Sequence, residues 1–136
     1  MTITKLANQR NLTSIVGLRV FVYFNLHKKC WSVRALEGDC KGCVVSHADV
    51  VYLRDASPKV LESGRQRVLR EKQKNVHAGI IGYIVLPQDF EGDSDKSITY
   101  NPYKYKSFVY KENEEYFLNS DWCKMDSVGR VQVLVD

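Results

Sequence analysis

Short stretches of hydrophobic and aromatic residues, separated by polar turn residues, run along most of this 136-residue chain. Residues 18–24 and 30–36 are rich in β-branched and aromatic side chains, which favour strands. Asn25 begins the polar stretch between them, where an Asn side chain can bond to nearby backbone, so a hairpin is expected. Two further apolar stretches, 43–47 and 49–55, are expected to extend a first antiparallel meander.

The segments "FNLHKKCWSV" (24–33) and "YNPYKYKSFV" (100–109) share one pattern: an aromatic residue, Asn, a Lys three places later, and a final Val. Pro102 suits the second position of a type I or II turn, so the second segment predicts another strand–turn–strand unit. Either the chain contains an internal duplication, or two hairpins without common ancestry use similar residues to form their turns. If the halves are pseudo-symmetric, the two turns frame one shared surface.

Between these units the pattern changes to one helix followed by one strand. A helix is expected from about Glu62 to Gln73, with an N-cap at Ser57, before Pro58, or at Ser63. The run 75–86 is the most strand-like in the chain and is expected at the centre of the sheet. Its two glycines, Gly79 and Gly82, mark points where backbone or a ligand approaches closely.

Together these elements predict an α+β fold, mainly antiparallel β, with two similar strand–turn–strand meanders around one short helix. The length suits a single domain of residues 1–136 with one core. Its expected parts are a first meander, a helix with a central strand, and a second meander, at residues 18–56, 57–86 and 97–136.

The net charge of +4 is concentrated in the middle of the chain. Residues 54–77 hold seven Lys or Arg and three acids, whereas the remainder holds thirteen of each sign. Such a segment attracts anions, and aromatic residues near arginines can stack nucleobases. An ordinary solvated helix face, with an Arg67–Glu71 pair four residues apart, is the competing interpretation.

The candidate ligand-binding residues come from this basic segment and from the two repeated turns. A basic helix face, a neighbouring amide and imidazole, and the turn lysines would together bind a phosphate group. They are Arg65, Arg67, Arg70, Lys74, Asn75 and His77, supported by Lys28 and Lys104.

The cysteines offer a weaker, metal-binding alternative. Cys40 and Cys43 form a C-x2-C pair, and His27, Cys30 and His47 complete a zinc-like spacing. However, six residues of strand separate Cys30 from the turn, which is about 20 Å at ~3.3 Å per residue. The expected state is a plain turn with free thiols and no cofactor, with zinc at Cys40 and Cys43 as the alternative.

Catalytic motifs are absent from the sequence: it contains no glycine-rich phosphate loop, no G-x-S-x-G and no H-E-x-x-H. The acidic run 89–95 lacks the Gly and Glu that a calcium loop requires, so it is interpreted as a linker. No catalytic residue is therefore assigned. If the protein is an enzyme, a small nuclease or lyase centred on His77 is the candidate.

Apolar runs in the chain are shorter than the ~18 residues that indicate a membrane span. The N-terminal residues lack the apolar core of a secretory signal, so a cytoplasmic protein without a membrane partner is expected.

The quoted segments, together with "GRQRVLREKQKNVHAGIIGYI" (64–84), resemble a group of small bacteriophage-encoded proteins without assigned chemistry. The resemblance covers most of residues 20–110 and transfers no catalytic residue. It implies expression in the cytoplasm of a bacterial host and interference with a host system.

These observations favour a non-enzymatic accessory protein that binds a phosphate-bearing ligand, either a nucleotide or a nucleic acid. The alternative from another class is a protein–protein inhibitor of a host enzyme, acting through sheet edges or exposed turns. A homo-oligomer is compatible with either.

Overall fold

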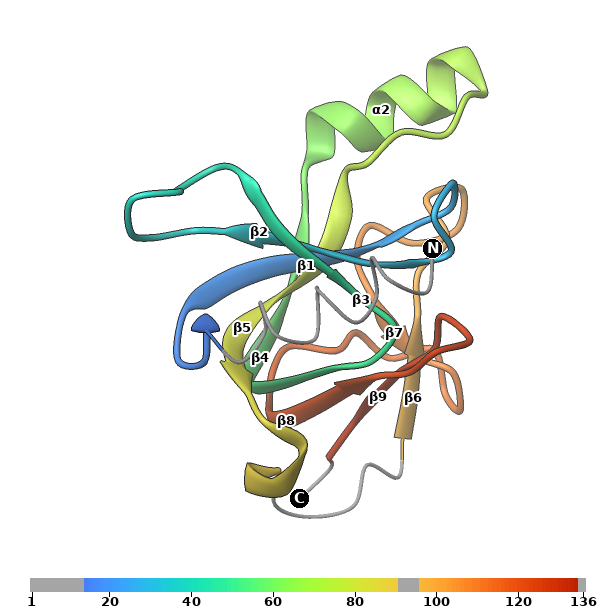
Figure 1. Cartoon of the computed structure of the whole chain (residues 1–136). Helices are drawn as coiled ribbons and strands as arrows, with labels where there is room; N and C mark the ends of the chain where they lie inside the picture. Colours follow the sequence, from blue (N-terminus) through green and yellow to red (C-terminus); the bar gives the residue numbers. More distant parts are fainter. Residues whose placement is uncertain (1–13, 91–95, 135–136) are drawn as a thin grey trace.

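The computed structural model describes residues 14–90 and 96–134, and within them nine strands form one antiparallel sheet (Figure 1). The strand order is β3-β2-β1-β5-β4-β8-β9-β6-β7. One helix, α2 (Glu62–Glu71), and a short 3₁₀ turn, η1 (Pro87–Asp89), complete the described elements. The strands are β1 (Arg19–Asn25), β2 (Cys30–Ala35), β3 (Val44–Ala48), β4 (Val51–Val60), β5 (Ala78–Val85), β6 (Lys96–Thr99), β7 (Val109–Tyr110), β8 (Ser120–Met125) and β9 (Val131–Val133). The predicted α+β class with a mainly antiparallel sheet is confirmed.

The first hairpin forms at the predicted place. The Asn25 side-chain oxygen accepts hydrogen bonds from the backbone N–H groups of His27 and Lys28, both at 3.0 Å. Lys29 then adopts a left-handed conformation (φ 54°), which brings Cys30 opposite Asn25. Asn101 acts in the same way, because its side-chain oxygen accepts from Tyr103 N at 2.9 Å. Both repeated segments therefore use an asparagine to build their turn.

The later strands differ from the predicted arrangement. β1, β2 and β3 form a simple meander, but β4 pairs with β5 and β8 rather than with β3. In the second half, β9 lies between β8 and β6 in the sheet. Strand β8 was not predicted, because its run "SDWCKM" alternates imperfectly between buried and exposed residues. A common ancestry of the two halves stays a prediction.

The sheet is strongly curved and encloses one apolar core. A single cluster of buried side chains extends from Ala48 on β3 to Ile98 on β6, near the two ends of the strand order. The indole N–H of Trp31 on β2 donates to the carbonyl of Asp126, in the β8–β9 turn, at 2.8 Å. Phe21 on β1 and Phe108, directly before β7, are both buried.

Helix α2 is an insertion at the tip of the β4–β5 hairpin, and in Figure 1 it stands above the ends of these strands. Val60 pairs with Ala78, and the backbone N–H of Leu61 donates to His77 O at 2.7 Å. Ser57 and Pro58 lie in β4 and Ser63 lies inside the helix, so both predicted N-caps were wrong; the N-cap is Leu61, with no side-chain hydrogen bond. Register pairing with β5 extends the strand past the position where Pro58 suggested a helix start.

The other end of α2 is close to its predicted limit. The helix ends at Glu71, and Lys72 adopts the left-handed conformation (φ 59°) with its N–H donating to Val68 O. Gly64 allows the helix to lie directly on the following segment, because a Cβ at this position would be 2.5 Å from the Cβ of His77. This glycine, which weakens an isolated helix, is therefore required for close packing here.

Asp126 should make stability depend on pH. Burial raises the pKa of its carboxyl, but hydrogen bonds from the backbone N–H groups of Arg130 and Val128 and from the Arg130 guanidinium outweigh this, so the pKa is lowered from 3.8. The carboxylate therefore stabilises the fold above pH 3.8, and this contribution is lost as pH falls through the lowered folded-state pKa.

We expect Asp126→Asn to lower the free energy of unfolding by about 1–2 kcal/mol at pH 7. Urea titrations over a range of pH should show the difference from the wild type shrinking at acid pH. Asp121→Asn, an exposed position on β8, is the matched control. A difference that stays constant with pH would contradict this role of the carboxylate.

Candidate functional site

An open cavity of about 860 Å³ lies beside α2, between the two repeated turns and the β8–β9 turn. Its volume is within the range typical of small-molecule sites. The floor is formed by buried core side chains, and the mouth carries exposed ones such as Leu26, Val76 and Tyr103. The lining residues are Val22, Tyr23, Phe24, Asn25, Leu26, Trp31, Val68, Lys72, Lys74, Asn75, Val76, His77, Ala78, Gly79, Ile80, Ile98, Thr99, Tyr100, Asn101, Pro102, Tyr103, Phe108, Met125, Gly129 and Val131.

The Lys and the acidic residues are unequally represented in the lining of this cavity, which carries positive charge and no carboxylate. Lys72 and Lys74 are the two lysines among the lining residues, which include no Arg, Asp or Glu. Lys72 Nζ lies 5.5 Å from the centre of the Tyr103 ring, which places a cation over an exposed aromatic face at the mouth. The cavity therefore combines an apolar floor with a positively charged mouth.

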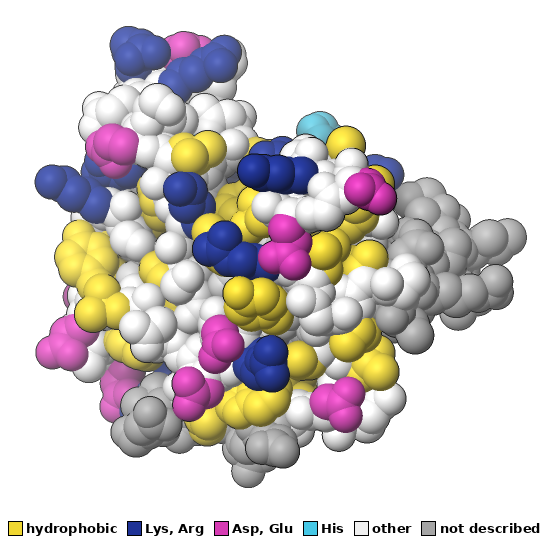
Figure 2. All heavy atoms as spheres, turned by 90° about the vertical axis from the view of Figure 1, so that its left-hand side faces the viewer, with side chains coloured by type: hydrophobic (Ala, Val, Ile, Leu, Met, Phe, Trp, Pro, Cys, Tyr) yellow, Lys and Arg dark blue, Asp and Glu magenta, His cyan; other side chains and the backbone are white. Residues whose placement is uncertain are grey.

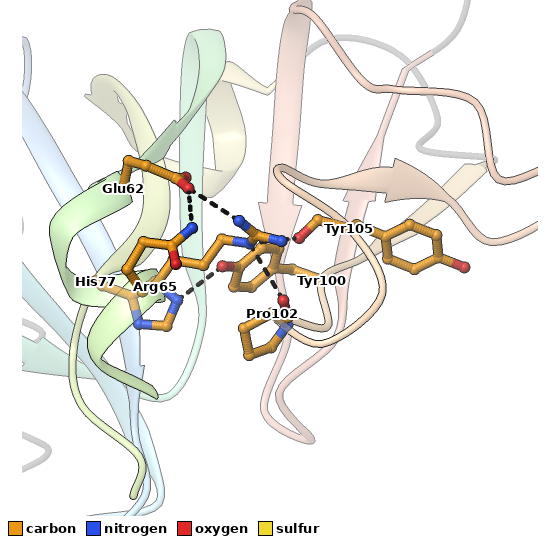
Figure 3. Close-up of polar contacts among 7 residues, drawn as sticks. Glu62, Arg65, His77, Tyr100, Pro102 and Tyr105 are labelled. Carbon is orange, nitrogen blue, oxygen red and sulfur yellow. Dashed lines mark hydrogen bonds and ion pairs between the residues drawn. The ribbon is translucent and has the colours of Figure 1, made fainter. Parts of the chain in front are cut away.

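One wall contains a hydrogen-bonded chain of polar groups. His77 is only 5% exposed, and its Nε2 lies 2.7 Å from the hydroxyl of Tyr100 (Figure 3). Its Nδ1 lies 2.9 Å from Asn75 Oδ1, and the Asn75 amide N–H donates to Gly64 O at 3.2 Å. The chain thus runs from Tyr100, directly after β6, through His77 to helix α2, and it holds the wall in one geometry.

The Tyr100 hydroxyl remains protonated at any ordinary pH. Burial raises its pKa to about 12, with the Glu62 carboxylate adding to the effect and the Arg65 guanidinium opposing it. The ring packs against Phe108, with a distance of 5.2 Å between the ring centres. Tyr100 therefore presents a neutral polar group on a fixed aromatic ring.

Arg65 joins α2 to the second repeated turn (Figure 3). It is 8% exposed, and its Nε donates to the carbonyls of Pro102 at 3.2 Å and Tyr105 at 3.1 Å. Its Nη1 donates to Glu62 Oε1 at 2.9 Å. Although it was predicted to bind ligand, Arg65 is placed where it holds the turn that forms part of the cavity mouth.

The other predicted arginines face outward. Figure 2 shows Lys and Arg side chains, with acidic ones among them, at the top of the molecule where α2 lies. The side chain of Arg67 is 64% exposed and pairs with Glu71 at 3.1 Å, as predicted, and that of Arg70 is 70% exposed, 3.7 Å from the same carboxylate. Neither lines the cavity.

Among the remaining predicted ligand-binding residues, Lys74, Asn75 and His77 line the cavity. Lys28 and Lys104 are exposed but are not lining residues, and Lys104 lies 3.7 Å from Glu114. The predicted residues that follow α2 thus lie together at the cavity. Those on the outer face of α2 lie outside it.

The cavity residues of the two repeated turns were not predicted to bind a ligand. Both copies of the aromatic–Asn pair, Phe24–Asn25 and Tyr100–Asn101, line the cavity, so the repeated turns do frame a shared surface. The repeated pattern itself was the available indication, but the lysines were chosen from it because of their charge. Lys72, which was not among the predicted ligand-binding residues, also lines the cavity.

The cysteines are distributed over buried and exposed positions. Cys40 and Cys43 are exposed at the β2–β3 turn, whereas Cys30 and Cys123 are buried. His47 Nδ1 lies 3.1 Å from the hydroxyl of Ser32 on the neighbouring strand. Within residues 14–90 and 96–134, no group of three or more His, Cys, Asp or Glu side chains is arranged to hold a metal ion.

No helix in the described part of the chain is both long and apolar enough to cross a membrane.

The fold and the cavity describe a small α+β protein with one candidate binding site, and comparison with known proteins places it in a phage family. The family model described as "Mycobacterium phage L5 gene 82 protein" matches residues 14–133. The Gene 82 protein of Mycobacterium phage L5 is 46% identical over 120 residues, covering 82% of this chain and 93% of that protein. The chain therefore belongs to the Mycobacterium phage L5 gene 82 protein family, which confirms the resemblance to bacteriophage proteins. No solved structure matches it.

Proposed function

We propose that this phage-family protein binds a nucleotide in the cavity beside α2, without chemical conversion. The observation that carries the proposal is the positive charge of the cavity lining. Lys72 and Lys74 lie at the mouth, and no lining residue has a carboxylate. Such a site attracts an anion, because its lining contains no carboxylate that would repel the oxygens of a phosphate group. A phosphate group would bind at the two lysines, with the nucleoside directed toward the aromatic and apolar interior.

The polar wall supports binding rather than catalysis. Both ring nitrogens of His77 already have partners within the protein, at Asn75 and Tyr100, so the imidazole acts as part of a fixed wall. The cavity volume of about 860 Å³ favours a mononucleotide-sized ligand over a long nucleic acid, which would need an extended basic groove. Sequestering such a ligand would let a phage protein interfere with a host system that uses it.

The test is the loss of binding when the cavity lysines lose their charge. We expect the double substitution Lys72→Gln and Lys74→Gln to weaken binding of nucleoside monophosphates at least about tenfold, since charge-assisted hydrogen bonds contribute about 1.5–3 kcal/mol. Isothermal titration calorimetry with a panel of nucleotides, nucleosides and inorganic phosphate measures this. Added salt should weaken the wild-type interaction more than that of the variant.

The matched control is Arg67→Gln with Arg70→Gln, which removes the same charge from the outer face of α2. Binding should change less than about twofold, because these side chains lie outside the cavity lining. If the arginine variant loses binding and the lysine variant keeps it, the ligand site is the outer helix face. If the wild type binds no nucleotide, the proposed function is wrong.

A further inference from the structure

The hydrogen bonds in the cavity wall determine which polar atoms can still meet a ligand. Three asparagines line the cavity, and the side-chain oxygen of each already accepts a bond from the protein. Asn25 Oδ1 accepts from His27 N and Lys28 N, and Asn101 Oδ1 accepts from Tyr103 N. Asn75 Oδ1 is the partner of His77. Each of these amide oxygens thus already accepts at least one hydrogen bond within the protein.

The orientation of the Asn75 amide determines the position of the proton on His77. The Asn75 amide nitrogen lies 3.2 Å from Gly64 O and must donate to it, so the opposite orientation would set two carbonyl oxygens against each other. The two atoms near His77 Nδ1 are then both oxygens, Asn75 Oδ1 at 2.9 Å and Asn75 O at 3.2 Å. Nδ1 therefore carries the proton of the neutral imidazole, and Nε2 is an acceptor.

The position of the proton on His77 determines which way the Tyr100 hydroxyl donates. Because Nε2 of the neutral His77 has no proton, the contact of 2.7 Å between them is a hydrogen bond that Tyr100 donates. The raised pKa of Tyr100, about 12, agrees with a hydroxyl that keeps its proton. The proton is directed at His77, so the lone pairs of the phenolic oxygen remain, and they accept hydrogen bonds only.

We propose that Tyr100 selects nucleotides whose base carries an amino group, by accepting a hydrogen bond from that group. The inference rests on the proposed function and names the ligand class of the same cavity. Adenine and cytosine carry an amino group beside an unprotonated ring nitrogen. In hypoxanthine, the base of inosine, a carbonyl replaces the amino group and would face the lone pairs of Tyr100 without a proton between them.

The experiment compares adenosine monophosphate with inosine monophosphate, which differ in this group while sharing ribose and phosphate. Isothermal titration calorimetry should show that adenosine monophosphate binds with an affinity about tenfold higher than inosine monophosphate. This difference is the effect expected when one hydrogen bond forms with the first ligand and is missing with the second. Tyr100→Phe keeps the ring that packs on Phe108 and removes the acceptor, so the ratio should fall to about one to two. Tyr116→Phe removes the hydroxyl of an exposed tyrosine that does not line the cavity, and it should leave the ratio unchanged.

Equal affinities for the two nucleotides, with binding still dependent on Lys72 and Lys74, would overturn the inference and leave the proposed function in place. A preference that survives Tyr100→Phe would also overturn the role of Tyr100. The absence of binding by any nucleotide to the wild type would overturn both proposals. If Tyr100→Phe fails to fold, the wild-type protein still tests the inference. The inference requires that adenosine monophosphate and inosine monophosphate bind with different affinities.

Discussion

Gly79→Ala is expected to lower the free energy of unfolding by about 3 kcal/mol or more. A Cβ at this position would lie 2.3 Å from the carbonyl oxygen of Val22 and 2.9 Å from two ring carbons of Phe21. Val22 belongs to β1, which pairs with β5 along the centre of the sheet, so its backbone cannot move without breaking strand hydrogen bonds. Urea denaturation followed by tryptophan fluorescence measures the loss.

Gly82→Ala provides a graded comparison on the same strand. Its added Cβ would lie 3.0 Å from Arg54 O and 3.0 Å from Leu53 Cβ, contacts that small shifts can relieve. We expect a loss of about 1–2 kcal/mol, clearly smaller than for Gly79→Ala. Similar stabilities for the two variants would show that the close approach of Gly79 to β1 is not the limiting contact.

Arg65→Met is the second substitution with a large expected effect, a loss of about 2–3 kcal/mol. The methionine fills much of the same space but leaves the carbonyls of Pro102 and Tyr105 without their charged donor. Because these carbonyls belong to the turn that frames the cavity mouth, nucleotide binding should weaken together with stability. Thermal and urea unfolding, with calorimetric titration below the unfolding temperature, measure both effects.

Arg67→Met is the matched control on the outward-facing side of α2. Its partner is Glu71, and its side chain is 64% exposed, so the ion pair contributes little. We expect a change within about 0.5 kcal/mol. Equal losses for the two variants would mean that Arg65 contributes only as part of the helix surface, and not through the turn it contacts.

The predictions that succeeded depend on local interactions. Asn25 and Asn101 form their turns with backbone groups two or three residues away, so the turns could be recognised from short segments. The close approach at Gly79 was likewise indicated by a glycine in a strand-like run. Strand β8 was missed because its hydrophobic alternation is weak and its pairing with β4 joins residues far apart in the sequence.

The candidate site was predictable only in part. The concentration of positive charge after residue 54 led to Lys74, Asn75 and His77, which line the cavity. Charge alone does not distinguish Arg65, which is buried against the turn around Pro102, from Arg67, which faces solvent. That distinction depends on which side of α2 packs on the rest of the protein.

The sequence by itself determined the antiparallel class, the position of the helix and the two asparagine turns, because periodicity and turn chemistry act over a few residues. Only the tertiary structure decided that both turns meet beside α2 and that Lys72 joins Lys74 at one mouth. It also decided the partners of His77 and Tyr100, 23 residues apart in the chain. These arrangements arise from the curvature of the sheet and from burial of the α2 face, which sum many weak contacts between distant segments.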